Sequence, residues 1–493
     1  MVEKGRARVT EAGVARGQAD AHGARGQADA HGARVVAKTQ GSAGAPRVRA
    51  LDARQSLVVS VTLFSMFFGA GNLILPPLLG LQAGPDAPAA MAGFLVAGIG
   101  LPVLGIIAVA LSGTIRELAD RVHPLFSRVF VAAVYLAIGP FLAIPRTSST
   151  AFEMLAPLLP EAADVAGAQV AFSVAFFVVA YVLALHPGHL TRLLGRVTGP
   201  ALVALIVAVT VSSIVAPTGS AAAVQPPYDA APLAQGFLTG YQTMDLLASL
   251  TFGIVIAENI RSLGVTDAAG LTREISKAGL LMAVLMGLIY CGFAYVGLTM
   301  GSVLPGATNG AAILTASATM HFGVIGTVVV AAIFLLACLN VCIGLISCCG
   351  TYFAETFGAE APEPHNVPLA RVPYRAWAFA FAAFSCFVSN FGLDTILAFS
   401  VPLLNALYPV SIVLVIMGML HRACDRLPQL WVWTVSVTAV ASVLVAARDA
   451  FLPGLALPLD ALPLASIGLG WVFPAVVAAV IGLVHGAIAR SRA

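Results

Sequence analysis

The sequence predicts an all-α membrane protein with twelve transmembrane helices, two of them broken. Hydrophobic residues make up 59% of the 493 positions and charged residues 10%, against about 25% charged residues in soluble domains. Loops that contain Lys and Arg alternate along the chain with loops that contain almost none, as expected if nearly all of these residues lie on one side of the membrane. In addition, two apolar segments in corresponding halves of the chain contain residues that interrupt helices.

Residues 1–50 are predicted to form a disordered cytoplasmic tail. They include a tandem nine-residue repeat, at 16–24 and 25–33, which is rich in Gly and Ala and cannot bury a core. The tail lacks the apolar centre of a removable signal peptide. A metal-binding role for His22 and His31 is a weaker alternative, and an over-extended gene start is another.

Residues 51–490 are predicted to form the membrane domain, because a helix of ~20 apolar residues crosses the hydrocarbon of a bilayer. The twelve expected spans lie near 56–79, 89–112, 126–148, 168–186, 197–216, 234–260, 275–299, 323–353, 374–391, 396–420, 429–447 and 465–488. Of the 26 Lys and Arg residues, only Arg146 and Arg448 then fall on the side opposite the N-terminus. Cytoplasmic loops carry the excess of Lys and Arg, so both termini are expected in the cytoplasm.

Span 1 contains residues that interrupt a helix at mid-depth. Gly69 and Gly71 are poor helix formers, Asn72 is polar, and Pro76-Pro77 removes two backbone donors. Every backbone polar group in lipid needs a partner, so the freed groups either pack on neighbouring helices or bind a ligand. A small-residue packing face is the simpler alternative.

Span 6 repeats this signal. Its Phe252-Gly253 pair corresponds to Phe68-Gly69 of span 1, and we expect the break of span 6 there. Span 6 comes five spans after span 1, so the repeating unit has five crossings, and a unit with an odd number of crossings is repeated upside down. The sequence therefore predicts a first repeat at 56–216, an inverted repeat at 234–420 and two extra helices at 429–488. Two broken helices that face one site are typical of secondary transporters.

A series of motifs runs through the apolar part of the chain, at residues 67–72 with Pro76-Pro77, 81–84, 139–140, 145–147 with 152–153, 240–245, 252–255, 309–314 and 400–402. Through these motifs the chain resembles the branched-chain amino acid:cation symporters, the BrnQ-type carriers of bacteria, over roughly residues 51–490. The resemblance implies a LeuT-type fold of five plus five inverted helices with two more appended. It also implies Na⁺-driven import of leucine, isoleucine and valine by alternating access, in the cytoplasmic (inner) membrane of a bacterium.

An amino acid zwitterion needs donors for its carboxylate, acceptors for its ammonium group and an apolar wall. The backbone N–H groups at the start of the second half-helix of span 1 suit the carboxylate. Unwound carbonyls of spans 1 and 6 suit the ammonium group. We therefore expect a pocket without fixed charge, which favours branched aliphatic substrates over dicarboxylates and basic amino acids. Its residues are predicted to be Phe68, Gly69, Ala70, Gly71, Ile138, Phe141, Leu250, Thr251, Phe252 and Gly253.

The resemblance also implies sites for the coupling ion. One Na⁺ is expected at Asn72 and Thr251, and a second at the carbonyls of Ser65 and Phe68 facing span 8. Span 8 has Val341 where a hydroxyl side chain is expected, so Asn340, or Ser347 in a shifted register, is a candidate replacement. Proton coupling is the alternative, and no other cofactor is expected.

Charged residues inside the membrane are costly and indicate function. Asp245 lies eight residues before Gly253, ~12 Å along a helix and too far to touch a substrate at the expected break. Arg146 lies at the outer end of span 3. The two are predicted to form an outer gate, the alternative being that both only reach the lipid headgroups.

Other function classes find little support in the sequence. It contains no His-Glu-x-x-His or Gly-x-Ser-x-Gly motif, so an integral membrane enzyme is not expected. A channel, the other alternative, would need polar residues along a whole path. The expected partners are an amino acid substrate and the lipid bilayer, with no nucleic acid and no obligate protein partner.

Overall fold

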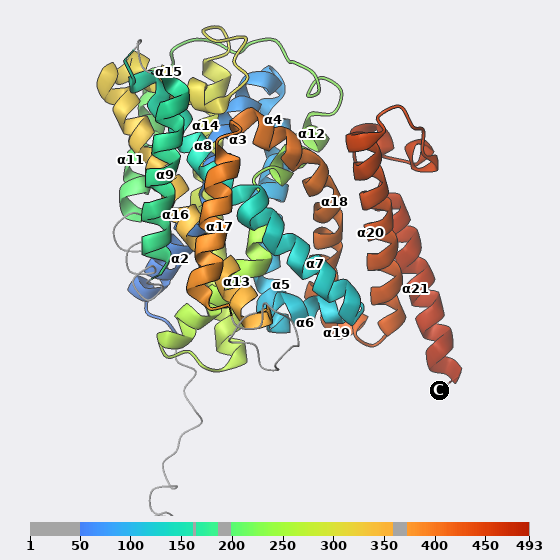
Figure 1. Ribbon diagram of the computed structural model, residues 1–493. Coiled ribbons are helices and arrows are strands. Elements are labelled where there is room, and N and C mark those ends of the chain that lie inside the picture. The colour runs from blue at the N-terminus through green and yellow to red at the C-terminus, as the bar shows by residue number, and fades with distance from the viewer. Residues whose placement is uncertain (1–49, 161–163, 186–198, 358–371, 493) are drawn as a thin grey trace, which may run out of the picture. The chain divides into compact units, whose positions relative to one another are not determined.

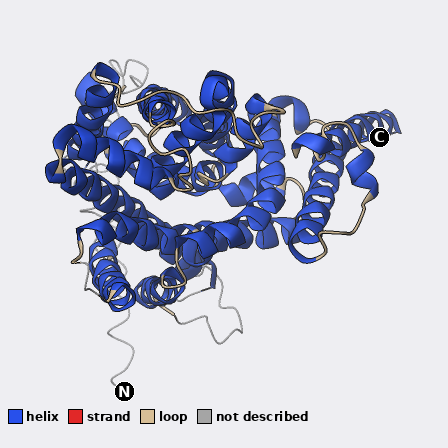
Figure 2. Ribbon diagram, turned by 90° about the horizontal axis from the view of Figure 1, so that it is seen from above, coloured by secondary structure: helices blue, strands red, loops and turns tan. Residues whose placement is uncertain are grey.

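The computed structural model describes residues 50–160, 164–185, 199–357 and 372–492, which are helical and contain no strand (Figure 2). The nine-residue repeat lies outside the described residues, so the disordered tail stays a prediction. In the first half of the chain the helices are α2 (Ala53–Phe67), α3 (Ala70–Ala83), α4 (Ala87–Leu95), α5 (Leu101–Ser112), α6 (Ile115–Asp120), α7 (Pro124–Leu136), α8 (Ala143–Leu155), α9 (Val165–Ala184) and α11 (Gly199–Val215).

The second half of the chain adds longer helices (Figure 1). They are α12 (Pro232–Tyr241), α13 (Asp245–Ser262), α14 (Ala268–Thr299), α15 (Gly310–Phe322), α16 (Val324–Phe357), α17 (Tyr374–Ser389), α18 (Leu393–Met419), α19 (His421–Cys424), α20 (Pro428–Phe451) and α21 (Val472–Arg492). Short turns of other helix types join them: η2 (Gly84–Asp86), η3 (Val96–Gly100), η4 (Ala137–Phe141), η5 (Ala156–Leu158), η7 (Pro458–Ala461) and η8 (Ala465–Ile467). Helix α20 packs between α18 and α21 at one edge of the bundle.

Eight helical stretches of the described chain are long and apolar enough to cross a membrane, or nine if the bent pair α12 and α13 forms one span. Helices α2 and α11 are apolar but shorter. On α9, Val170, Val174 and Val178 follow one another at every fourth position and are exposed, as expected of a face that contacts lipid. The structure is thus a helical membrane domain, while the number of twelve spans and the inverted repeat stay predictions.

The predicted interruption of span 1 is present in the structure. Helix α2 ends at Phe67, Phe68 is extended with φ −76° and ψ 90°, and α3 begins at Ala70. Between them Gly69 is also extended, a conformation open to any residue. What requires glycine there is space, because a Cβ on Gly69 would lie 3.0 Å from a methyl carbon of Val341 on α16.

The predicted break of span 6 at Phe252-Gly253 is wrong, because α13 runs without interruption from Asp245 to Ser262. Gly253 serves helix packing instead: a Cβ there would lie 2.9 Å from Val109 of α5. A glycine inside a membrane helix can therefore mark a close crossing as well as a break.

Span 6 is interrupted ten residues earlier, at Gln242, Thr243 and Met244, where the axes of α12 and α13 differ by 45°. Thr243 stabilises this turn, since its Oγ1 donates to the Gly240 carbonyl (2.9 Å) and accepts from the Asp245 N–H (3.3 Å). Met244 has φ 65° and ψ 7°, the left-handed conformation that side chains other than glycine rarely adopt.

Span 3 contains a third interruption, which we did not expect. Gly139 has φ −90° and ψ −124°, outside the helical region, and Pro140 follows it. The kink directs two neighbouring side chains to different places. Ile138 is fully buried, whereas Phe141 is 45% exposed and its ring contacts that of Phe384 (5.6 Å between centroids).

Two pairs of helices cross with their backbones in direct contact. A Cβ on Gly80 of α3 would lie 1.9 Å from the Ala294 carbonyl oxygen of α14. In the opposite direction, a Cβ on Gly297 of α14 would lie 1.8 Å from the Pro77 carbonyl oxygen of α3. Helices α4 and α12 make the same arrangement through Gly93 and Gly236. Because no side chain fits between them, the half-helices next to the two interruptions are fixed to α14 and to α4.

Gly297→Ala is expected to lower the free energy of unfolding by about 1–3 kcal/mol, the usual cost of overpacking. Gly287→Ala is the matched control on the same helix, since the nearest atom to its new Cβ would be the Ile99 Cδ1 at 3.9 Å. Thermal unfolding of both purified variants in detergent measures the difference. Equal melting temperatures would contradict the direct backbone contact.

Candidate functional site

The interruptions of spans 1, 3 and 6 meet at one small cavity, here called the central cavity. Its volume is about 30 Å³, which is room for water but not for an amino acid. The residues that line it are Met66, Phe67, Gly69, Ala70, Gly71, Asn72, Ile138, Ala143, Arg146, Thr147, Thr243, Met244, Asp245, Ala248, Phe252, Val341 and Leu345.

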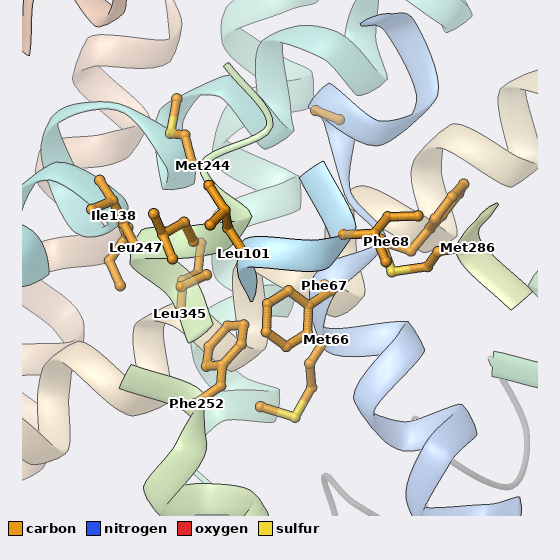
Figure 3. Close-up of a cluster of buried hydrophobic side chains, with 14 of the residues drawn as sticks. Met66, Phe67, Phe68, Leu101, Ile138, Met244, Leu247, Phe252, Met286 and Leu345 are labelled. Atoms are coloured by element: carbon orange, nitrogen blue, oxygen red, sulfur yellow. The ribbon is translucent and has the colours of Figure 1, made fainter. Parts of the chain in front are cut away.

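One wall of the central cavity is apolar. The rings of Phe67 and Phe252 meet edge to face, with 5.3 Å between their centroids. Ile138 and Leu345 complete this wall, as Figure 3 shows, together with Val341 of α16. Side chains from four separate helical segments therefore form a surface suited to an aliphatic group.

Arg146 of α8 brings a positive charge to the cavity, with only 3% of its surface exposed. Its Nη1 donates to the Gln242 carbonyl at 2.8 Å, across the interruption of span 6. Its Nη2 lies 2.0 Å from the position that a Cβ on Gly71 would occupy. Only glycine leaves room for the guanidinium group, which thus lies over the first turn of α3.

The first turn of α3 is itself electropositive. Helix N-termini carry unpaired N–H groups and about half a positive charge, and Gly69 supplies no capping side chain. The Arg146 guanidinium next to these N–H groups therefore creates a region that favours an anion. A carboxylate placed between them would contact donors on both sides.

Asp245 brings a negative charge to the same cavity and is also 3% exposed. Its carboxylate accepts from the Asn72 Nδ2 at 2.6 Å and from the Tyr290 hydroxyl at 3.4 Å. Asn72 also donates to Tyr290. Within the described structure Asp245 and Arg146 make no direct ion pair, so neither buried charge is neutralised by close contact with the other.

The expected distance of Asp245 from the interruption of span 6 is wrong. The interruption directly precedes Asp245 instead of lying eight residues after it, and Asp245 lines the central cavity together with Arg146. The expectation that Asp245 is too far away to touch a substrate at the break falls with this error. The central cavity therefore carries two ionisable side chains, whereas a pocket without fixed charge was expected. A gating role for the pair stays a prediction.

The structure brings together half of the residues predicted to bind substrate: Gly69, Ala70, Gly71, Ile138 and Phe252 line the central cavity. Phe68 faces α14, where it stacks on Phe64 (4.8 Å) and lies beside Met286 (Figure 3). The hydroxyl of Thr251 donates to the Ala248 carbonyl of its own helix. The cavity is not lined by Phe68, Phe141, Leu250, Thr251 or Gly253.

Of the predicted ion ligands, the central cavity is lined by Asn72 alone. Ser65 and Asn340 are buried elsewhere, and the Asn340 amide nitrogen has no hydrogen-bond partner in the described part of the chain. Val341 lies against Gly69 at the cavity wall. Ion binding at these residues stays a prediction.

Some residues in and around the cavity were not expected from the sequence. Leu345 of α16 lines the cavity, and Tyr290 of α14, although not part of the lining, contacts the Asp245 carboxylate and Asn72. A tyrosine within the apolar α14 could have indicated a buried polar partner. For Leu345 no local signal exists, because its position at the cavity follows from how distant helices pack.

A sequence model of the family described as "Branched-chain amino acid transport protein" matches residues 52–489. The chain belongs to this family. Among relatives, the branched-chain amino acid permease BraB of Bacillus subtilis is 38% identical over 443 residues, which cover 88% of this chain and 96% of BraB. The branched-chain amino acid transport system 2 carrier protein of Pseudomonas aeruginosa is 37% identical, covering 87% and 95%. The permease BrnQ of Escherichia coli K12 is 34% identical, covering 88% and 96%.

Solved transporters share the fold of this branched-chain amino acid transport protein family member. Mhp1, a nucleobase-cation-symport-1 family transporter in a closed conformation with bromovinylhydantoin bound, matches with a TM-score of 0.56 at 14% identity over 89% of this chain and 94% of Mhp1. A manganese transporter of Eremococcus coleocola matches with a TM-score of 0.55 at 13% identity, covering 88% and 94%. At these identities the likeness concerns the fold alone.

Proposed function

We propose that the protein imports leucine, isoleucine and valine together with Na⁺ by alternating access, and that the central cavity is the substrate site. The family and the relatives named as branched-chain amino acid permeases support the substrate class. The observation that carries the assignment of the site is the presence of one buried cation and one buried anion, Arg146 and Asp245, on a single cavity.

This charge pair fits a zwitterion. The substrate carboxylate binds between the Arg146 guanidinium and the first N–H groups of α3, and the ammonium group binds Asp245. A bound zwitterion leaves the net charge of the site unchanged, whereas lysine or glutamate adds an uncompensated buried charge that costs several kcal/mol. The aliphatic side chain lies against Phe67, Phe252 and Ile138.

The central cavity in this closed structure is too small for leucine, so substrate entry requires the surrounding half-helices to separate. The contact between Arg146 Nη1 and the Gln242 carbonyl joins α8 to the interruption of span 6. A carboxylate that pairs with Arg146 competes for the donors of this contact. Substrate binding is thereby coupled to the conformation of the segment that closes the cavity.

Na⁺ binds oxygen ligands, which Asp245 and the Asn72 side chain supply at the ammonium end of the cavity. The second candidate is a proton-coupled carrier of the same fold. One observation favours it: the Asp245 carboxylate is buried, and the side chains that donate hydrogen bonds to it, Asn72 and Tyr290, are uncharged, so a proton could replace Na⁺ there.

Uptake of radiolabelled leucine into proteoliposomes tests the proposal. We expect uptake under an inward Na⁺ gradient, its loss when the gradient is collapsed by a sodium ionophore, and competition by isoleucine and valine but not by lysine or glutamate. Liposomes without protein are the control. Uptake driven by a proton gradient without Na⁺ would instead support the second candidate, and no leucine uptake under either gradient would refute the substrate class.

A further inference from the structure

A second and larger cavity, here called the α12 cavity, lies on the other side of the span 6 interruption. Its volume is about 340 Å³, within the range of small-molecule sites. The residues that line it are Leu75, Leu78, Leu79, Gln82, Pro227, Tyr228, Gln235, Leu238, Thr239, Tyr241, Gln242, Val401, Leu404, Asn405 and Gly468. They come from α3, α12, α18 and two loops.

Gln242 connects the α12 cavity to the central cavity. It lines the α12 cavity, while its backbone carbonyl accepts from Arg146, which lines the central cavity. In α3, the first residues up to Asn72 line the central cavity, and Leu75, Leu78, Leu79 and Gln82 line the α12 cavity. The two cavities therefore follow one another along the same half-helix, separated at Gln242.

Four carboxamide side chains line the α12 cavity: Gln82, Gln235, Gln242 and Asn405. All four are half-buried. None of these side chains makes a hydrogen bond to the described part of the protein, in contrast to the hydroxyl groups of Tyr228 and Thr239, which pair with each other at 2.8 Å. Together the four amides offer eight N–H donors and four carbonyl acceptors to a ligand.

The remaining lining defines the class of that ligand. Five leucines line the cavity, and no Asp, Glu, Lys or Arg does so. A ligand with a net charge would lack a counter-charge there. A zwitterion with an aliphatic side chain fits this lining. The carboxamides can donate to its carboxylate and accept from its ammonium group, and the leucines can contact its side chain.

We propose that the α12 cavity is a second binding site for a neutral aliphatic amino acid, which waits there before it enters the central cavity. This inference rests on the proposed function. The uncharged α12 site holds the zwitterion more weakly than the charge pair of the central cavity does, so transfer is favourable in that direction. Gln242 is the residue that must move, because its carbonyl contact with Arg146 lies between the two sites.

Equilibrium binding of radiolabelled leucine to the purified protein in detergent tests the inference. We expect two leucines per chain in the natural protein and one in Asn405→Leu, which replaces a carboxamide of the α12 cavity with a larger apolar group without adding charge. Gln235→Met, a second variant of similar size, is expected to behave in the same way. Gln429→Leu removes a carboxamide at the start of α20, which does not line the α12 cavity, and should leave two bound leucines per chain. Size-exclusion chromatography establishes that each variant is folded.

The uptake assay gives an independent readout. Asn405→Leu is expected to raise the KM for leucine at least ~5-fold while the remaining central site still binds. One leucine per chain in the natural protein, unchanged in Asn405→Leu and Gln235→Met, would overturn the second site and leave the proposed function standing. Failure of the natural protein to bind any leucine would overturn the proposed function as well, and the two failures are thereby distinguished.

Discussion

Asp245→Asn is expected to reduce leucine uptake by about two orders of magnitude while the purified protein stays folded. The substitution keeps the size of the side chain but removes the carboxylate that is proposed to bind the substrate ammonium group. Breaking a buried charge arrangement by removing one partner costs ~3–5 kcal/mol, and ~2.8 kcal/mol already corresponds to a hundredfold change. Uptake into proteoliposomes at matched protein density measures the effect.

The control for this variant is Asp164→Asn, which alters an exposed aspartate at the start of α9 and should leave uptake within twofold. Leucine counterflow, which exchanges substrate without net ion movement, separates two roles of Asp245. Loss of both uptake and counterflow is expected for a substrate ligand. Retained counterflow with lost net uptake would assign Asp245 to the coupling ion alone, and unchanged uptake would remove it from the site.

Gly71→Ala is expected to reduce uptake by a similar factor through a single methyl group. The new Cβ would lie 2.0 Å from the Arg146 Nη2 and 3.3 Å from the Gln242 carbonyl oxygen, so the guanidinium group must leave the first turn of α3. Gly98→Ala is the matched control. Its new Cβ would lie beside Thr243 of the span 6 interruption, but its nearest atoms would be 3.6 Å away. Leucine affinity measured by binding should fall in the first variant and not in the second. Equal affinities would show that Arg146 does not act from this position.

The sequence predicted the interruption of span 1 because its signal is local. Glycines, an asparagine and two prolines inside one apolar segment are unusual enough to be recognised without any knowledge of neighbours. At Gly253 the same kind of signal led to a wrong prediction of a helix break. Glycine is needed there because Val109 of α5 packs closely against its backbone. Gly139-Pro140 of span 3 is a local pattern of the same kind and is typical of a kink, but the sequence analysis used it only as one motif of the family.

The site was predicted in part. Arg146 and Asp245 were paired from the cost of charge in the membrane, which is a property of the residues themselves. The distance of Asp245 from the site was wrong because it was measured from the misplaced break of span 6. Leu345 could not be assigned from sequence, since it reaches the cavity only through the packing of α16 against the interruption of span 1.

The interruption of span 6 differs in kind from that of span 1, because Gln242, Thr243 and Met244 include neither glycine nor proline. Methionine is a good helix former, and its left-handed backbone costs ~1–2 kcal/mol relative to a helical one. A continuous helix would therefore be the less strained backbone for this segment, and the cost of the turn is offset by Thr243, by the Arg146 contact with the Gln242 carbonyl and by the neighbouring contacts. Release of Arg146 can let α12 and α13 join end to end. Opening of the cavity would then be a local coil-to-helix transition, driven by relief of backbone strain, rather than a rotation about a permanently flexible joint.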